Sequence, residues 1–351
     1  MRVQEERYAD LERPAVGCVW QIPFVVVAYI PTIDGEMVDF ERTGFRGTVQ
    51  QLRDRILRAV RVTKWMMEEA TRFHGYKEPG ARSSLGYRCV RFVTILEDIP
   101  KGRSAGSAGV FFPDYGKIVE QVGGKNLVNQ QGTKEFWIYH WHHGSIAPIE
   151  TNLSSALSGD ISNSDRQNDL PIYDKSYMVV GANFNRGPDK HVHNIGHQME
   201  ALLSYVNQRQ DSNTDLFNKQ FCGQDDKGKF QQGRCGNCHF PPNATKDYDY
   251  FNPKSVPSDI EDWNPQGTGV KKLTTYRTWE RLPYRCPTGD KIRQPGTILE
   301  DDAWWYLYWF QNFPGHESHI AHPKGEMTNW WRFLGDWDGA FKEKYGLWKI
   351  K

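Results

Sequence analysis

The chain has 351 residues, enough to bury a substantial core in one large domain or two ordinary ones. Its 44 Lys and Arg residues balance 43 Asp and Glu residues, so no overall field attracts nucleic acid or an anionic membrane, and we expect no nucleic-acid partner. No apolar run approaches the roughly 20 residues that span a bilayer, so we expect no transmembrane segment.

Strand-type and helix-type patterns alternate along the first 210 residues. Apolar, β-branched runs predict strands over 21–30, 87–96, 135–141 and 175–183. Apolar residues at helical spacing predict helices over 49–73, 115–122 and 190–208. Such alternation is typical of an α/β core with a mostly parallel sheet.

The composition changes after residue 209. Asn, Asp, Gly, Pro and Cys dominate up to residue 300 with little periodicity, which predicts loops, and the segments 303–310 and 328–345 predict aromatic helices. We therefore expect an α/β core over 1–210 that carries a site at its strand ends. A loop-rich Cys and aromatic region over 211–351 is expected to pack on that core as part of one structural unit.

The six cysteines form an even set, which is compatible with disulfides in an oxidising compartment. Four of them follow residue 220, in the loop-rich region that disulfide bonds would stabilise most. Within Cys235-Gly-Asn-Cys238-His239-Phe-Pro-Pro-Asn243 the spacing resembles half of a zinc ribbon, but no second C-x-x-C follows. Cys222 and Cys286 could complete a four-cysteine set; we rank disulfides ahead of it.

Ten of the eleven histidines fall in four places, a clustering typical of metal ligation or proton transfer. The best-defined place is a predicted helix on which His193, His197 and Glu200 share one narrow stripe. Two imidazoles and a carboxylate on one stripe can grip a divalent cation. The alternative is an ordinary surface helix, because the apolar residues lie on the opposite face.

Two predicted strands end in polar side chains. His140, His142 and His143 come at the end of one strand, followed by Glu150 and Asn152, and the other is followed by Asn183 and Arg186. In an α/β sheet the carboxyl ends of strands are where ligands bind. The alternative for His140 and His142 is alternation along an exposed strand. We take His316, His319 and His322 as surface or secondary ligands, and the Asp160, Asp165 and Asp169 segment as a solvated loop in preference to a calcium site.

Seven short segments in this order resemble a family of secreted bacterial proteins whose reaction is not established. Its members carry a strand reading "EVW", then "ES", "GFNYER", a "GHxxE" helix and a "CGNxHFPPNS…DYD" loop. The matching segments here are Phe136-Trp-Ile-Tyr139, Glu150-Thr-Asn152, Ser162-Asn-Ser164, Gly181-Ala-Asn-Phe-Asn-Arg186, Gly196-His-Gln-Met-Glu200, Cys235-Gly-Asn-Cys-His-Phe-Pro-Pro-Asn243 and Asp247-Tyr-Asp-Tyr250.

The resemblance implies secretion and a shared polar site. It singles out Glu150, Asn183, Arg186, His197, Glu200, His239 and Asn243. It also lowers the rank of His191 and His193 as candidate site residues, because the family does not require histidine at these positions. The first seven residues are charged and lack the apolar core of a secretory signal, so we expect a secreted or cell-surface protein whose leader has been removed, with a cytoplasmic protein as the alternative.

These observations lead to a hypothesis of metal-assisted hydrolysis. Glu150, His197, Glu200 and His239 are expected to surround a divalent cation, with Zn²⁺ ranked ahead of Ca²⁺. Glu150 or Glu200 would act as general base, and Arg186 would stabilise developing charge. The substrate, an extracellular peptide or polysaccharide, would be oriented by Asn152, Asn183 and Asn243.

Two alternatives stay open. Glu150 and Glu200 could instead be the paired carboxylates of a metal-free glycosidase, which would place them about 5 to 10 Å apart beside a groove. The chain could also be a non-catalytic surface protein, binding a surface glycan or joining an extracellular assembly, with a structural metal. Its 13 Trp residues suit sugar or protein contacts.

Overall fold

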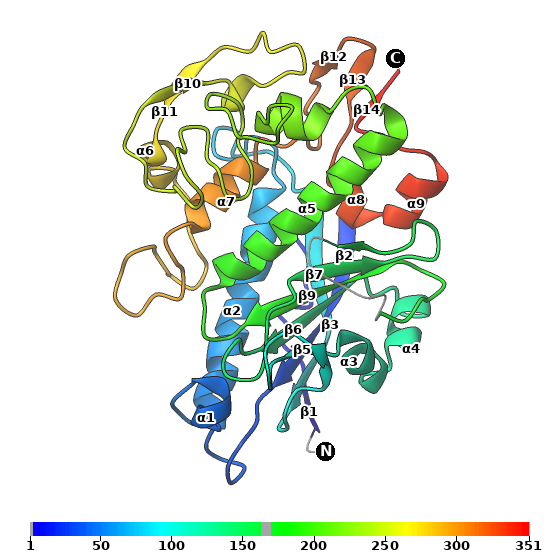
Figure 1. Ribbon diagram of the computed structural model, residues 1–351, viewed down its shortest axis with the longest axis vertical. Helices are drawn as coiled ribbons and strands as arrows, with labels where there is room; N and C mark the ends of the chain where they lie inside the picture. Colours follow the sequence, from blue (N-terminus) through cyan, green and yellow to red (C-terminus); the bar gives the residue numbers. More distant parts are fainter. Residues whose placement is uncertain (1–2, 163–169, 351) are drawn as a thin grey trace. The chain divides into compact units, whose positions relative to one another are not determined.

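The computed structural model describes residues 3–162 and 170–350 and divides the chain into two compact units (Figure 1). The sheet unit comprises Met1–Pro14, Gln21–Lys64 and Tyr87–Gln198. The aromatic unit comprises Ala15–Trp20, Trp65–Gly86 and Met199–Lys351. Two long helices, α2 (Val49–Ala70) and α5 (Pro188–Gln210), are continuous and contribute residues to both units.

The remaining elements have the following bounds in chain order. The strands are β1 (Val3–Glu6), β2 (Trp20–Tyr29), β3 (Leu85–Ile95), β4 (Lys101–Ser104), β5 (Phe111–Pro113), β6 (Glu135–His140), β7 (Thr151–Ser154), β8 (Ile161–Ser162), β9 (Tyr177–Asn183), β10 (Val256–Ser258), β11 (Lys272–Thr274), β12 (Ala321–His322), β13 (Gly325–Met327) and β14 (Trp348–Lys349). The helices are α1 (Phe40–Thr43), α3 (Tyr115–Gln121), α4 (Gly124–Asn129), the π-helix η1 (Leu216–Cys222), the 3₁₀ helix η2 (Ile260–Asp262), α6 (Tyr276–Glu280), α7 (Ala303–Phe310), α8 (Arg332–Gly335) and α9 (Trp337–Lys342).

The sheet unit is built on a seven-stranded sheet in the order β1-β3-β2-β6-β9-β7-β8. The pairs β2–β6 and β6–β9 are parallel, and the backbone bonds from Trp20 to Ser84 and from Ile30 to Ile95 run β3 parallel to β2 as well. The outer pairs β1–β3, β7–β9 and β7–β8 are antiparallel. The expected α/β fold with a mostly parallel central sheet is therefore confirmed.

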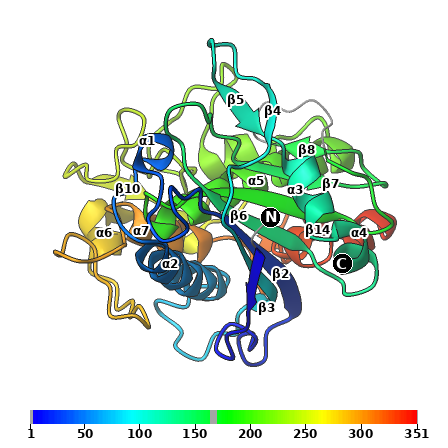
Figure 2. The same cartoon turned by 90° about the horizontal axis from the view of Figure 1, so that it is seen from below.

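Strand β6 is completely buried, and its alternating side chains mark the two faces of the sheet. His140 faces α3, where its Nε2 lies 3.1 Å from the hydroxyl of Tyr115. Its neighbour Tyr139 points the other way, toward His191 at the start of α5, with 5.8 Å between ring centroids. Figure 2 shows the same division, with α3 and α4 on one side of the sheet and α2 on the other.

Most predicted elements are found within a few residues of their expected ends. The segment 328–345 differs, because it forms two short helices in place of one. Asp336 leaves the helical conformation between them (φ −156°, ψ 65°), and its carboxylate accepts a hydrogen bond from Gly339 N at 3.2 Å to cap α9. An aspartate that bonds the next turn offers the backbone an alternative to a continuous helix.

The expected disulfides are wrong. No two of the six cysteines, all of which lie in the described residues, are joined in a disulfide. Burial raises the pKa of the Cys222 and Cys235 thiols well above their usual range, so both stay protonated.

Aromatic packing builds the core of the aromatic unit. Every residue of α7 is buried, and the Phe313 ring lies 4.8–6.3 Å from six other rings. Those rings belong to Phe217, Phe221, Trp309, Phe310, Trp330 and Trp331. The predicted loops after residue 209 are thus held by aromatic side chains.

A buried carboxyl in the sheet unit makes stability depend on pH. Glu135 is 2% exposed, and burial raises its pKa to about 7 although Trp137 Nε1 and the Tyr87 hydroxyl both bond it. The folded chain holds this proton up to about pH 7, whereas the unfolded chain releases it near pH 4.5. The free energy of unfolding should therefore fall by about 3 kcal/mol as pH rises from 4.5 to 7.

Urea unfolding at pH 5 and pH 8 checks this, with Glu135→Gln expected to flatten that part of the profile. The exposed Glu41→Gln serves as the matched control and should leave the profile unchanged. Equal slopes for the wild type and Glu135→Gln would contradict the assignment.

Candidate metal centre

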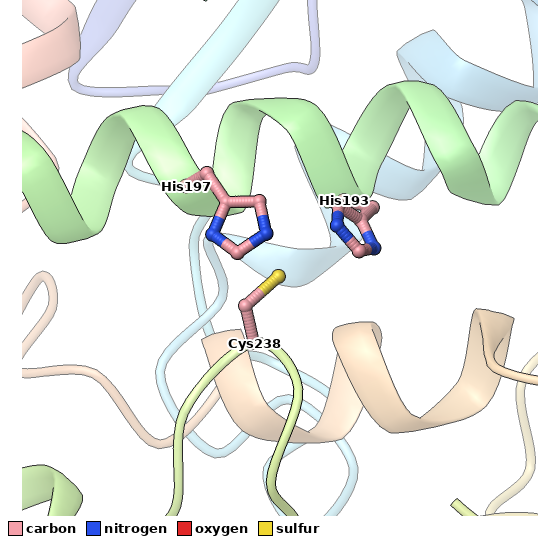
Figure 3. Close-up of side chains that lie close together, drawn as sticks. All are labelled: His193, His197 and Cys238. Atoms are coloured by element: carbon pink, nitrogen blue, oxygen red, sulfur yellow. The ribbon is translucent and has the colours of Figure 1, made fainter. Parts of the chain in front are cut away.

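Helix α5 begins where the sequence favours a helix start and carries two histidines one turn apart. Pro188 occupies its first turn with Asp189 beside it, an arrangement that suits the fixed φ of proline and the helix dipole. His193 and His197 project from the same side of the helix (Figure 3), and their ring centroids are 4.5 Å apart. The four-residue spacing produces this pairing, because residues four apart lie on one face.

One turn beyond His197, Glu200 of α5 forms a hydrogen bond with the loop that contains Cys238. Within the aromatic unit the backbone N–H of Cys238 donates to Glu200 Oε1 at 2.8 Å. Gly236 allows the loop to turn, because its φ of 78° is in the left-handed region and a Cβ there would strike the carbonyl of Phe240.

The rest of the Cys238 backbone is held by buried aromatic residues. Its carbonyl accepts hydrogen bonds from Trp305 Nε1 at 3.3 Å and from the Tyr250 hydroxyl at 3.2 Å. The Tyr250 hydroxyl lies 2.9 Å from that of Tyr306, which in turn donates to Asp302 Oδ2 at 2.9 Å. Burial raises the pKa of both phenols well above the usual range, so both stay protonated and able to donate.

Three side chains of types that can bind a metal ion form one group. One ligand atom from each of His193, His197 and Cys238 lies within 4.8 Å of the other two, and Figure 3 shows the sulfur facing both rings. A Zn²⁺ ion with Zn–N of ~2.0 Å and Zn–S of ~2.3 Å holds such atoms about 3.5 Å apart in a tetrahedron. The group could therefore hold a metal ion.

Of the predicted ligands, His197 belongs to this group. Glu200 lies beside it and uses Oε1 to hold the Cys238 backbone. The adjacent His239 turns elsewhere: its Nδ1 pairs with Asp247 at 3.0 Å, and its ring lies 4.1 Å from that of Tyr248.

Glu150 and Asn152 lie at β7 in the sheet unit and are not part of the group. The carbonyl of Glu150 accepts from Gly181 N at 2.8 Å, and Asn152, which is 2% exposed, donates to Asp160 at 3.5 Å. Of the segment predicted to be a solvated loop, only Asp160 is described, because Asp165 and Asp169 lie outside the described residues, as do Asn163 and Ser164.

The other predicted polar residues stabilise local turns. Asn183 Oδ1 accepts from Asn185 N at 3.0 Å, and its carbonyl accepts from Arg186 N at 3.0 Å. Asn243 is fully buried and donates to the carbonyls of Asn252 and Lys254. These hydrogen bonds explain the presence of asparagine at both positions by the local turns that it stabilises.

Three of the more conspicuous histidines lie in the sheet unit, where His140 and His191 are buried and His142 is half-buried. Burial lowers the pKa of His140 to about 4 and that of His191 to about 3. Burial, His140 and Arg186 together lower the pKa of His142 to about 2. All three are neutral at physiological pH, and neither His140 nor His142 is on an exposed strand face.

His193 and Cys238 are the candidate ligands that the sequence hypothesis left out. The i, i+4 histidine pair was a usable signal for His193. Cys238 was assigned to a disulfide, and only the bond to Glu200, 38 residues away in the chain, reveals its place.

The Glu200–Cys238 bond can be tested by substitution. Glu200→Ala leaves a buried N–H without an acceptor and should lower the free energy of unfolding by about 1–3 kcal/mol. Glu200→Gln keeps an acceptor oxygen and should recover most of the loss. Urea unfolding gives the energies, and hydrogen exchange of the Cys238 amide should be faster in Glu200→Ala alone. Equal stability of the two variants would contradict this role.

Comparisons with known proteins add no relative. No protein-family model matches the chain, and the searches of curated proteins and of solved structures also find no match. Among the described residues, no helix has both the length and the apolar character needed to cross a membrane. The motif resemblance therefore stays a prediction, and functional argument rests on the chain's own geometry.

Proposed function

We propose that the chain binds one divalent metal ion through His193, His197 and Cys238 and acts as a metal-assisted hydrolase. The observation that carries the proposal is the convergence of two imidazoles and one thiol within 4.8 Å. Glu200 is a positioning residue in this proposal, because its carboxylate fixes the backbone of the third ligand.

The ligand set favours zinc over calcium. Calcium takes six to eight oxygen ligands, whereas nitrogen and sulfur are the usual zinc ligands. Three protein ligands also leave the fourth tetrahedral position to water or substrate, as in catalytic zinc sites. A bound Zn²⁺ would lower the pKa of that water and polarise a scissile carbonyl or glycosidic oxygen.

The substrate class comes from the sequence. Hydrolysis of an extracellular peptide or polysaccharide rests on the motif resemblance, and so does secretion. The cysteines, which had indicated an oxidising compartment, form no disulfide and do not support secretion.

A second candidate function is a non-catalytic binding protein with a structural metal. The burial of two of the three ligands favours it, because Cys238 is fully buried and His193 is 7% exposed, whereas His197 is half-buried. Structural zinc sites are closed, whereas catalytic sites must admit substrate.

Metal content tests the ligand set. Full-length protein purified without chelator should carry about one zinc per chain by elemental analysis, and His197→Ala and Cys238→Ala should lose it. His239→Ala is the matched control, because it removes the neighbouring histidine of the same loop and should keep the metal. Loss of metal in His239→Ala with retention in Cys238→Ala would overturn the proposed set in favour of the one expected from sequence.

Hydrolysis separates the two functions. A panel of chromogenic esters, peptides and dyed polysaccharides should reveal an activity that chelation removes and added Zn²⁺ restores. Cys238→Ser should lower its kcat/KM by about 100-fold or more. Stoichiometric zinc without activity on any substrate, together with variants that lose only stability, would contradict the hydrolase and support the binding protein with a structural metal.

A further inference from the structure

The aromatic unit contains a cavity of about 570 Å³ that the proposed metal chemistry does not use. Its volume falls within the range of small-ligand sites, about 300–1,000 Å³. Segments 73–74, 260–268, 312 and 318–321 form the wall, all within this one unit. The cavity is therefore defined by a single unit of the chain.

The wall offers many hydrogen-bonding groups and little charge. Eight of its thirteen residues are polar, and none is Lys or Arg. Asp262 is its one carboxylate. Burial lowers the pKa of His74 to about 4, so its imidazole is neutral at physiological pH, and it also interacts with the side chain of Asn312. This composition disfavours phosphate or another anion, which basic side chains would attract.

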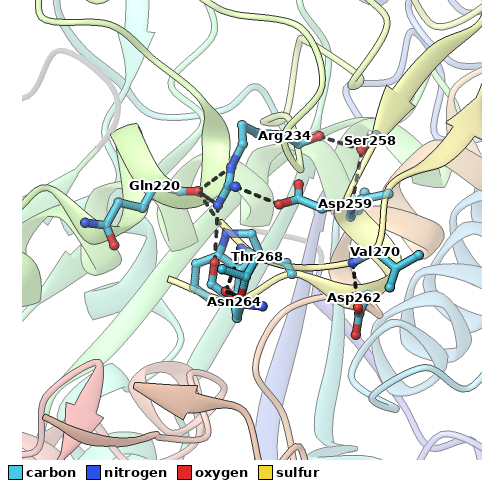
Figure 4. A network of polar contacts seen from close by, with 10 residues as sticks. Gln220, Arg234, Ser258, Asp259, Asp262, Asn264, Thr268 and Val270 are labelled. Atoms are coloured by element: carbon cyan, nitrogen blue, oxygen red, sulfur yellow. Dashed lines mark hydrogen bonds and ion pairs between the residues drawn. The ribbon is translucent and has the colours of Figure 1, made fainter. Parts of the chain in front are cut away.

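Hydrogen bonds fix the wall before any ligand arrives (Figure 4). Arg234 pairs with Asp259 at 2.6 Å and donates through Nε to the carbonyl of Gln220 at 2.9 Å. The same carbonyl accepts from Trp263 Nε1 at 2.8 Å. Asn264 Oδ1 accepts from both the amide and the hydroxyl of Thr268, each at 3.2 Å. A wall held in this way loses little entropy when it binds.

Several polar groups of this wall keep hydrogen-bonding capacity. Asp262 uses Oδ2 to accept a hydrogen bond from Val270 N at 2.7 Å, so its Oδ1 can still accept one from a ligand. The amide nitrogen of Asn264 also remains, since its interactions use the oxygens. In the described part of the chain, the exposed side chain of Gln266 makes no hydrogen bond. One acceptor, one donor and one group that does both thus border the cavity.

Other segments of the cavity wall have unusual backbone conformations. His74 and His319 have φ values of 51° and 46°, and Glu317 beside the wall has 60°. Non-glycine residues seldom adopt such angles, and those that do cluster at binding and catalytic sites. Apolar groups, among them Phe73 and Ile320, lie beside these polar ones.

We infer that this cavity binds an uncharged carbohydrate residue. Vicinal hydroxyls both donate and accept, which matches carboxylate, carboxamide, hydroxyl and neutral imidazole groups. The apolar part of the wall suits the C–H face of a sugar ring. The inference does not depend on the metal centre, so either can fail alone.

The test uses the full chain and methyl glycosides of glucose, galactose, mannose and N-acetylglucosamine. Saturation-transfer NMR should show contact with at least one glycoside, and calorimetry should give its affinity. Gln266→Ala and Asp262→Asn should each weaken binding about fivefold to tenfold, and Ser318→Trp should abolish it by filling the cavity.

Gln208→Ala is the matched control, because it removes an exposed glutamine of α5 that does not line the cavity, and it should bind as the wild type does. Urea unfolding of each variant checks that the fold is kept. No binding of any glycoside, unchanged binding by Ser318→Trp, or displacement of the glycoside by inorganic phosphate or choline would overturn the inference.

Discussion

The hydrogen bond from the Cys238 backbone to Glu200 joins a loop to a helix that already carries two imidazoles. Glu200 follows His197 by three residues, so the two lie about 4.5 Å apart along the helix axis. A loop fastened at that point can reach only a short stretch of α5. In the proposed metal site the helix would supply two ligands, and the bond to Glu200 would position the backbone of the third.

Buried aromatic residues make this attachment durable. Trp305 and Trp309 of α7 bury their rings, yet each donates its indole N–H to a loop carbonyl, at Cys238 and Gly236 respectively. Phenylalanine would pack equally well but would leave both carbonyls without these donors. The aromatic residues that pack the unit thus also orient the site, which explains how a loop-rich region keeps a defined shape without disulfides.

The elements could be predicted where each has its own local signal. Helix α2 begins at a reciprocal cap in which Thr48 and Gln51 bond each other's backbone N–H, and α5 begins at Pro188. His197 followed from helical spacing in the same way. The third ligand did not, because Cys238 and His239 are neighbours and sequence does not show which one faces the helix. Asn237 decides this by accepting from the amides of His239 and Phe240, a turn that sends the imidazole toward Asp247.

Burial of the Cys238 sulfur also bears on when the centre forms. A thiolate in a site with no solvent exposure is costly unless a cation neutralises it. Binding of a metal ion at the proposed site would therefore be coupled to loss of the thiol proton. The bond to Glu200 involves the Cys238 backbone and not its sulfur, so it leaves the sulfur available to a metal ion at the proposed site.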